Sequence, residues 1–325
     1  MKLLHSIQVF DQLIAADGVE TFDLAVNPLS VILLTLRPLN DTGTLLNFES
    51  ALGIYGAVNR MSVIYRGSGV VGMTGRDLAA LNYFRHGIMP WQASHVNTNN
   101  DRRAVVLPIL MGRWPYDPVS CFPATRRGEL VLELDLDIAD SGYDGLRLSV
   151  ETIELLDATP EEFERKVQIT QTFAATGEND VDLPTGNLVR GILAFGTTGF
   201  AGAAPAPTLG RLSTYLDNEQ WGYSSTDFEV AHMLPSLMGR NPPAMDGRVH
   251  TLLEVAGGGV VTATQAEGAS SIGSGGWGNY CYLDFDPTRD DTFSMDTSGA
   301  SRLYVRSDAE AANLVRMIAV ERIPI

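Results

Sequence analysis

Apolar and polar residues alternate along many short segments of this chain. In the clearest segment, 129–138, leucine or isoleucine fills every second position from Leu130 to Ile138, and acidic residues fill four of the other five. A period of two with one apolar face is typical of an antiparallel strand with one buried face. Similar runs between Gly, Pro, Asn and Asp residues predict strands at 6–14, 20–25, 29–37, 58–66, 69–74, 80–86, 103–109, 129–138 and 145–155.

Helical signals are few. Thr159 and Pro160 are typical of an N-cap and a first helical position, so a linker helix is predicted over 159–167. A second short helix is predicted over 308–317. Two runs rich in Gly and small residues are predicted to be loops, 196–210 and 256–278.

The second half of the chain repeats features of the first half. The triplet IQV at 7–9 returns as VQI at 167–169, and the Asp-Leu pair at 23–24 returns at 182–183, with offsets of 160 and 159 residues. Both halves also end on the pattern Val-Glu-x-Ile, at 150–153 and 320–323. A chance likeness between two β-rich halves is the alternative interpretation.

The chain has 325 residues, a length that favours two domains. Together with the repeat, it predicts an all-β fold of two tandem eight-stranded jelly-roll (β-sandwich) domains. The first domain is predicted over 1–157 and the second over 158–325, joined by the short helical linker.

The excess of acidic over basic residues argues against one class of function. The formal net charge is −16, which argues against direct nucleic-acid binding, because that needs Lys and Arg side chains against phosphates. No run of about 18 apolar residues predicts a membrane-spanning helix. The opening residues lack the features of a signal peptide, so an unprocessed N-terminus is expected. Cys121 and Cys281 lie far apart and are expected to be buried free thiols.

No enzyme signature is found. The five histidines lack metal-ligand spacing, and His86 and His95 are expected to be surface loop residues. The glycines of 67–72 (GSGVVG) fit a hairpin turn, with no helix following them to hold a phosphate. We therefore expect no catalytic residue, no cofactor and no enzymatic activity.

One acidic cluster is a candidate metal site. Four carboxylates fall within ten residues near the C-terminal end, namely Asp284, Asp286, Asp290 and Asp291. Oxygen ligands at this density fit calcium, although the pattern of an EF-hand is absent. The alternative is a strand that runs into an acidic turn. Aromatic residues in loop-like contexts (113–118, Trp221, Tyr223 and Trp277) are candidates for sugar stacking, loop anchoring or subunit contacts.

The strand and turn pattern resembles that of the double-jelly-roll major capsid proteins of membrane-containing icosahedral viruses and tailless phages, a lineage that includes the larger adenovirus hexon. The resemblance is carried by 60–84, by 105–137 with its Leu-Pro strand, Pro-rich loop and Gly-Glu-Leu, and by 279–305. It extends over nearly the whole chain, but its motifs are strands and turns without a chemical signature.

The resemblance implies a structural coat protein. Three copies would form a pseudo-hexagonal homotrimer, and trimers would tile an icosahedral shell over an internal membrane. Its partners would be neighbouring capsomers and penton or minor capsid proteins, with no direct nucleic-acid contact. The protein would be made in the host cytoplasm and reside in the virion. Residues 1–12 would lie at the base near the membrane, or their first apolar residues would belong to the core of the first strand.

Two other classes stay open. A carbohydrate-binding or glycoside-hydrolase-type β-sandwich protein would bring its loop aromatics together on one concave face. A tail, spike or adhesin component would also be trimeric but would not tile.

Overall fold

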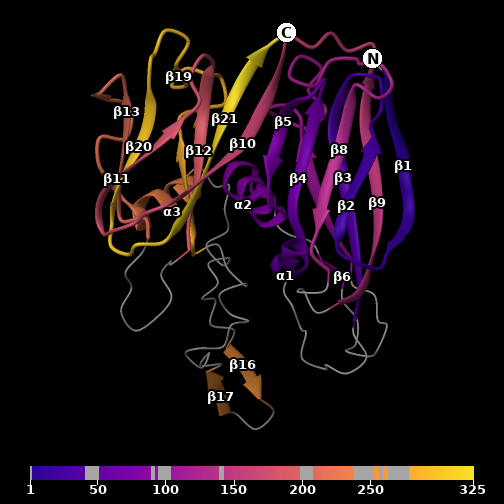
Figure 1. Cartoon of the computed structure of the whole chain (residues 1–325), viewed down its shortest axis with the longest axis horizontal. Coiled ribbons are helices and arrows are strands. Elements are labelled where there is room, and N and C mark those ends of the chain that lie inside the picture. The colour runs from indigo at the N-terminus through magenta and orange to yellow at the C-terminus, as the bar shows by residue number, and fades with distance from the viewer. Residues whose placement is uncertain are drawn as a thin grey trace.

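Two β-rich halves stand side by side, the first coloured indigo to magenta and the second magenta to yellow (Figure 1). The computed structural model describes residues 2–40, 51–88, 92–93, 104–138, 143–197, 208–237, 252–255, 259–262 and 278–325. Both chain ends lie at the same end of the molecule (Figure 1). No helix in this described part of the chain is long and apolar enough to cross a membrane.

The first half is a sandwich of two antiparallel sheets. One has the strand order β1 (Lys2–Ile14), β9 (Tyr143–Leu156), β3 (Leu29–Asn40), β7 (Ala104–Leu110) and β6 (Gln92–Ala93). Facing it are β2 (Gly18–Asp23), β8 (Leu130–Leu136), β4 (Val58–Tyr65) and β5 (Ser68–Met73), in that order. Successive strands cross between the sheets, and the first strand pairs with the last, which is the jelly-roll order.

The second half repeats this order in its main strands. Its first sheet contains β10 (Glu162–Thr172), β21 (Leu314–Pro324), β12 (Leu188–Gly196) and β18 (Tyr280–Asp284), with β19 (Met295–Asp296) against β12. Its second sheet contains β11 (Gly177–Leu183), β20 (Leu303–Ala309), β13 (Arg211–Leu216), β14 (Glu219–Gln220) and β15 (Thr226–Asp227). A separate hairpin joins β16 (Leu252–Val255) and β17 (Gly259–Thr262). The prediction of an all-β fold with two tandem jelly rolls is confirmed.

The repeated residues occupy equivalent strands. The triplet at 7–9 lies in β1 and its copy in β10, and the two Asp-Leu pairs lie at the ends of β2 and β11. The Val-Glu patterns lie in β9 and β21, the last strand of each roll. The repeat in the sequence therefore reflects a repeat of structure rather than chance.

The two rolls share one continuous sheet. β5, at the edge of the first roll, pairs in parallel with β10 of the second roll through Lys166↔Val71 and Val167↔Gly72. This joins the four strands of the first roll to five strands of the second roll, β19 included, in a single nine-stranded sheet. The predicted boundary between 157 and 158 falls in the short segment between β9 and β10.

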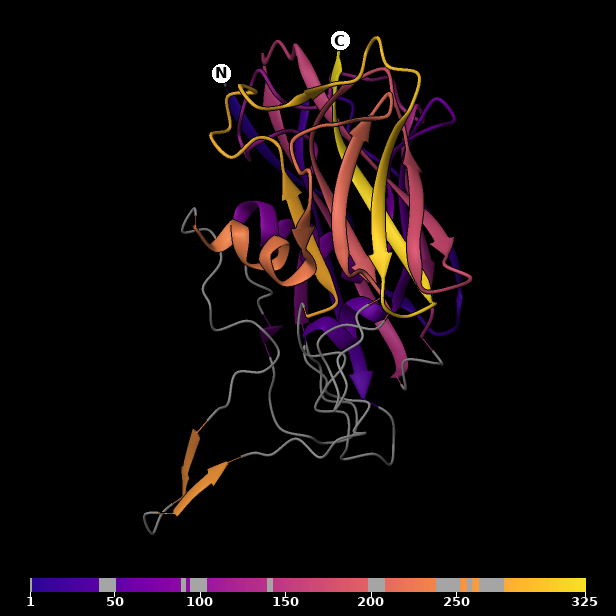
Figure 2. The ribbon, with the colours of Figure 1, turned by 90° about the vertical axis from the view of Figure 1, so that its left-hand side faces the viewer.

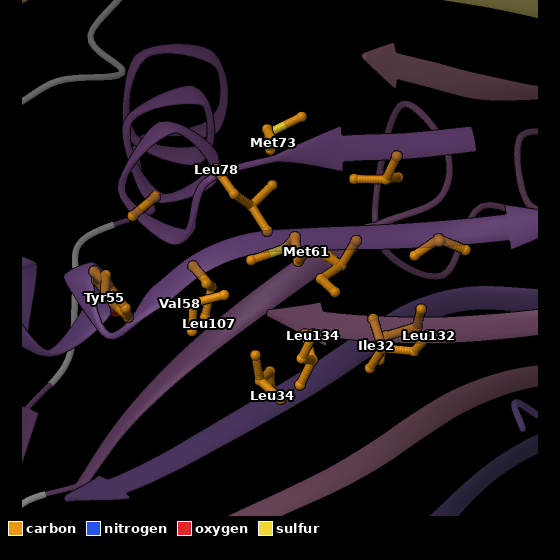
Figure 3. Close-up of a cluster of buried hydrophobic side chains, with 14 of the residues drawn as sticks. Ile32, Leu34, Tyr55, Val58, Met61, Met73, Leu78, Leu107, Leu132 and Leu134 are labelled. Atoms are coloured by element: carbon orange, nitrogen blue, oxygen red, sulfur yellow. The ribbon is translucent and has the colours of Figure 1, made fainter. Parts of the chain in front are cut away.

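Each roll has its own apolar core. In β8, Leu130, Leu132, Leu134 and Leu136 are buried while the residues between them are partly exposed, as the alternation predicts. Figure 3 shows Leu132 and Leu134 of β8 beside Ile32 and Leu34 of β3, across the sandwich. Buried residues of the second roll, among them Tyr282 and Val320, join the core cluster of the first roll. The cores therefore meet at the junction.

The strand predicted at 80–86 is wrong, because this segment lies in α2 (Gly75–His86). Thr74 caps the helix by accepting a hydrogen bond from the Asp77 amide, and Gly87 ends it with a φ of 65°. Nearly every side chain of α2 is buried, so the segment lacks the one-sided period that reveals a surface helix. The hairpin at Gly67 is confirmed, with positive φ at Arg66 and Gly67, but a helix does follow it.

Both other helix predictions are wrong. The linker helix predicted over 159–167 is replaced by β10, which pairs with β21 over eleven residues, so tertiary pairing overrides the local helix-start signal. The segment 308–317 contains the end of β20 and the start of β21. Among the described residues the helices are α1 (Ala51–Gly56), α2 and α3 (Phe228–Leu237).

The two predicted loops are described only in part. In 196–210, residues 198–207 lie outside the described residues. The segment 256–278 contains β17, so its prediction as loop throughout is wrong. In this stretch the structure describes the pairing of residues 259–262 with residues 252–255.

Candidate functional site at the junction of the two rolls

Buried charged side chains gather where the two rolls meet. Arg85, in the last turn of α2, directs its guanidinium group at the Glu164 carboxylate of β10, and both side chains are fully buried. Lys166 lies 3.0 Å from Glu164 and donates a hydrogen bond of 2.9 Å to the Leu110 carbonyl oxygen. Because residues i and i+2 of a strand share a face, β10 presents both charged groups to the first roll.

Arg190 of β12 adds a third cation. Its guanidinium donates to the carboxylates of Glu164 at 3.1 Å, Glu162 at 2.6 Å and Asp291 at 2.8 Å. We call this set the junction cluster, made of Arg85, Glu162, Glu164, Lys166, Arg190 and Asp291. Each of its carboxylates faces at least one cation of the set, and Arg113 and Arg322 add contacts to Asp291 and Glu162, in a region where an unpaired ion would be costly.

The electrostatics of the junction cluster favour fixed ions. Burial opposes ionisation of Glu164, but the charges of Arg85, Lys166 and Arg190 outweigh it and hold the pKa of this carboxyl well below its usual range. Burial opposes ionisation of Asp291 too, yet hydrogen bonding to Arg190 and the nearby cations bring its pKa to about 2. A general acid or base needs a pKa near the working pH. These carboxylates therefore suit structural pairing better than proton transfer.

The start of α2 makes a second contact with the other roll. The buried Asp77 carboxylate accepts a hydrogen bond of 2.8 Å from the Tyr280 hydroxyl of β18 and two of 2.8 Å from the Arg316 guanidinium of β21. Burial, then the charge of Asp77, raises the pKa of Tyr280 well above its usual range. Further along the helix, the Phe84 ring lies 5.3 Å from the His232 ring of α3. The helix thus ties the rolls together at both its ends.

The four predicted calcium ligands face arginine and hydroxyl groups. Asp284 accepts from Arg289 at 3.0 Å, and Asp290 accepts from the Thr288 hydroxyl at 2.6 Å. Asp286 lies 3.4 Å from Arg113, which also contacts Asp291. Among the described residues no group of three or more His, Cys, Asp or Glu side chains converges as metal ligands would. Calcium at these four residues stays a prediction, and the geometry supports the alternative of an acidic turn.

The remaining candidate residues are placed by packing. The His86 ring meets the Trp114 ring edge-on with centroids 5.5 Å apart, and His86 is half-buried at the end of α2, so its prediction as a surface loop residue is wrong. Trp221 and Tyr223 both pack edge-on against Phe285 within the second roll. His95 and Trp277 lie outside the described residues. Cys121 and Cys281 are buried free thiols, as predicted.

Several large apolar side chains are exposed on β1 and on α3. On β1 these are Leu3, Leu4, Ile7, Phe10 and Leu13, so the alternative that the first three apolar residues, Leu3, Leu4 and Ile7, belong to the core is wrong. On α3 they are Val230, Met233 and Leu237. A pocket of about 670 Å³ opens beside β1 and β2, lined in part by Gln8, Asp23 and Glu154. None of the junction cluster lines this pocket.

Sequence reasoning singled out Asp291, as a calcium candidate, and missed the rest of the junction cluster. Glu162, Glu164 and Lys166 alternate with Phe163, Arg165 and Val167, which is a strand period. That signal was masked by the helix-start signal at Thr159 and Pro160. Arg85 and Arg190 carry no local sign of burial, because their partners lie 79 and 26 residues away.

Searches of known family models and of curated proteins find no match to this sequence. Solved structures do match it along its whole length. The STIV MCP, from Sulfolobus turreted icosahedral virus, superposes with a TM-score of 0.69 at 12% identity, covering 100% of this chain and 97% of that chain. The chain has the double-jelly-roll fold.

Two further structures share this double-jelly-roll architecture. The major capsid protein P2 from bacteriophage PM2 has a TM-score of 0.60 at 12% identity, covering 99% of this chain and 98% of that chain. The PBCV-1 virus capsid has a TM-score of 0.57 at 10% identity, covering 99% of this chain and 93% of that chain. At these identities the likeness concerns the double-jelly-roll fold itself.

Proposed function

We propose that this chain is a viral major capsid protein, a structural coat subunit of an icosahedral virus particle. The observation that carries the proposal is the full-length match of two tandem jelly rolls to capsid proteins, which covers nearly all of both chains. Few residues of either chain lie outside the matched fold, so little of the chain remains for another activity. The protein would reside in the virion after synthesis in the host cytoplasm.

The quaternary form we propose is a homotrimer with a pseudo-hexagonal outline. Each copy contributes two similar rolls, so three copies place six similar domains around one axis, and such a unit tiles a hexagonal lattice. The junction cluster and the shared sheet support this, because they hold the two rolls of one copy at a fixed angle. Neighbouring trimers and penton or minor capsid proteins would be its partners.

We place the end of the molecule that holds both chain termini against the internal membrane. Strand β1, which exposes several apolar side chains, starts at that end (Figure 1). The net charge of −16 supports a position away from the genome.

A structural role also fits the chemistry of the described residues. The side chains at the centre of the junction cluster, Arg85, Glu164 and Lys166, are buried and paired between the rolls, where substrate would have no access. Trp221 and Tyr223 pack edge-on against Phe285 and are only partly exposed, which does not support a sugar-binding platform at these two residues. The shell is therefore favoured over the carbohydrate-active alternative.

The test is the native mass of the purified chain by light scattering, with negative-stain images of the same sample. A mass of about 106 kDa, three times 35.2 kDa, with flat hexagonal outlines is the expected result. A stable monomer, or turnover of an oligosaccharide by the same sample, would contradict the proposal.

A further inference from the structure

Helix α3 exposes an apolar stripe. Val230, Met233 and Leu237 are 48%, 57% and 76% exposed. Their spacing of i, i+3 and i+7 places them on one face of the helix. The opposite face is buried in the second roll through Phe228 and Ala231. Both faces of α3 are therefore apolar, although only one packs against its own roll.

The matching face of α2 holds the two rolls together. α2 and α3 occupy the same place in their rolls. Each follows the strand or edge segment after a hairpin turn, β5 for α2 and residues 219–227 for α3, and each precedes an inner-sheet strand, β7 or β18, with short strands in between. Counted from the first helical residues, Gly75 and Phe228, Val230 corresponds to Asp77 and Leu237 to Phe84. These are the positions through which α2 contacts Tyr280, Arg316 and His232 of the second roll.

Strand β1 presents the complementary surface. β1 ends its sheet and pairs with β9 on one side, whereas its counterpart β10 pairs with β21 on one side and with β5 on the other. The offset of 160 residues places Ile7, which is 58% exposed, at the position of Val167. Val167 is a residue through which β10 pairs with β5.

The second roll has a sheet edge at the position that β5 occupies in the first roll. The β13–β14 turn at Asp217 and Asn218 has two positive φ values, as does the β4–β5 turn at Arg66 and Gly67. Residues 219–227 follow the β13–β14 turn in the same way that β5 follows the β4–β5 turn, so the two segments are equivalent. They form the outer edge of the sheet of β11, β20 and β13.

We propose that copies of this chain join head to tail, with α3 and the edge 219–227 of one copy against β1 of the next. This contact would repeat between copies the junction that α2 and β5 make with β10 inside each copy. The inference rests on the proposed homotrimer and names the surfaces that close it. A heterologous contact forms a ring when its rotation closes, and two similar rolls per copy close a six-domain ring at three copies.

The chemistry of the two junctions differs. At the offset of 160, the counterparts of Glu164 and Lys166 are Leu4 and Ser6. Val230 likewise replaces Asp77, so the contact between copies exchanges buried ion pairs for apolar packing. This accounts for the apolar side chains that β1 and α3 expose, because their burial would drive association.

Cysteine cross-linking tests the contact in the full chain. Ile7→Cys and Ser224→Cys place thiols on exposed positions of the two edges, and the native Cys121 and Cys281 are buried and do not compete. Neighbouring strands lie about 5 Å apart, so a short bismaleimide should join the copies of the double variant. We expect a denaturing gel to end at three chains. Each single variant should stay uncross-linked, because a head-to-tail contact never brings the same position together.

A second measurement uses the α3 stripe. The double variant Met233→Glu with Leu237→Glu should lower the native mass threefold, with a near-UV circular dichroism spectrum like that of the wild type. Val19→Glu is the control, because Val19 is 60% exposed but lies on β2, outside the proposed contact. The counterpart of β2 in the second roll is β11, which pairs with β20 of its own roll.

The outcomes separate the two proposals. A wild-type monomer overturns the proposed coat function. A wild-type trimer that neither cross-links through residues 7 and 224 nor responds to the α3 substitutions overturns this contact and leaves the coat function standing. Cross-linking of the Ile7→Cys single variant to itself overturns the head-to-tail geometry.

Discussion

Glu164 is the single side chain on which the junction cluster depends most. It contacts Arg85, Lys166 and Arg190, all nearly or fully buried. Removing its charge would leave these cations with fewer counter-charges in a region shielded from solvent. Loss of one partner from a buried ion pair is more costly than its replacement by an apolar pair, because the remaining charge stays desolvated.

Glu164→Gln is expected to lower the free energy of unfolding by about 3 kcal/mol, measured by urea denaturation. Glu178→Gln is the matched control, since the Glu178 carboxylate is 70% exposed beside Arg306 and should change stability by less than about 1 kcal/mol. Equal effects from the two variants would contradict the role of the junction cluster.

The pKa values of the same cluster set the response to acid. The pKa of Glu164 lies well below its ordinary value of 4.5, and that of Asp291 is about 2 against 3.8. The unfolded chain therefore binds more protons than the folded chain in acid, so stability is present above these ordinary values and is lost as the pH falls through the folded values.

We expect the urea midpoint to decline steadily as the pH falls from about 5 to about 2, and the decline to be shallower in Glu164→Gln. The midpoints of both proteins, measured over the same pH series, test this. Parallel curves would mean that other carboxyls control acid unfolding.

Helix α2 is the element that links the two rolls. Its start holds Tyr280 and Arg316 through Asp77, and its end holds Glu164 through Arg85. The direction of both side chains depends on where the helix begins, and Thr74 fixes that point by accepting from the Asp77 amide. The cap therefore contributes to the junction as well as to the helix.

Thr74→Ala should lower the free energy of unfolding by about 1 kcal/mol, because the Asp77 amide loses its acceptor. Thr74→Ser keeps a hydroxyl in place and should retain most of the stability. Thermal denaturation of the two variants beside the wild type measures the difference. A Ser variant as unstable as the Ala variant would show that the methyl group, rather than the cap, matters.

For the whole molecule, the shared sheet and the meeting cores couple the two rolls. β5 and β10 belong to one nine-stranded sheet, and residues of the second roll complete the core cluster of the first. Opening one roll would expose the buried charges and apolar surface of the other. The two rolls should therefore unfold as one unit.

Hydrogen exchange in increasing urea is expected to give the amides of β8 and β20, one strand from each roll, the same opening free energy. Glu164→Gln should lower both together. If β20 exchanged through an opening that left β8 protected, the rolls would be independent domains.

Much of the architecture followed from patterns local to the sequence. The alternation of β8 predicted its buried face, and the repeat of 7–9 at 167–169 predicted two equivalent rolls. These signals are readable because a strand has a fixed period of two, which shows in any strand with one buried face. The turn at Gly67 was readable for a similar reason, since its positive φ favours glycine.

The junction required the folded chain. Capping signals at Thr159 predicted a helix, yet pairing with β21 made the segment a strand, and the buried α2 lacked a one-sided period. The partner of Arg85 lies 79 residues away and that of Asp77 lies 239 residues away. Local patterns report which face of an element is buried, whereas edge pairing and the neutralisation of buried charge depend on segments that meet only when the chain folds.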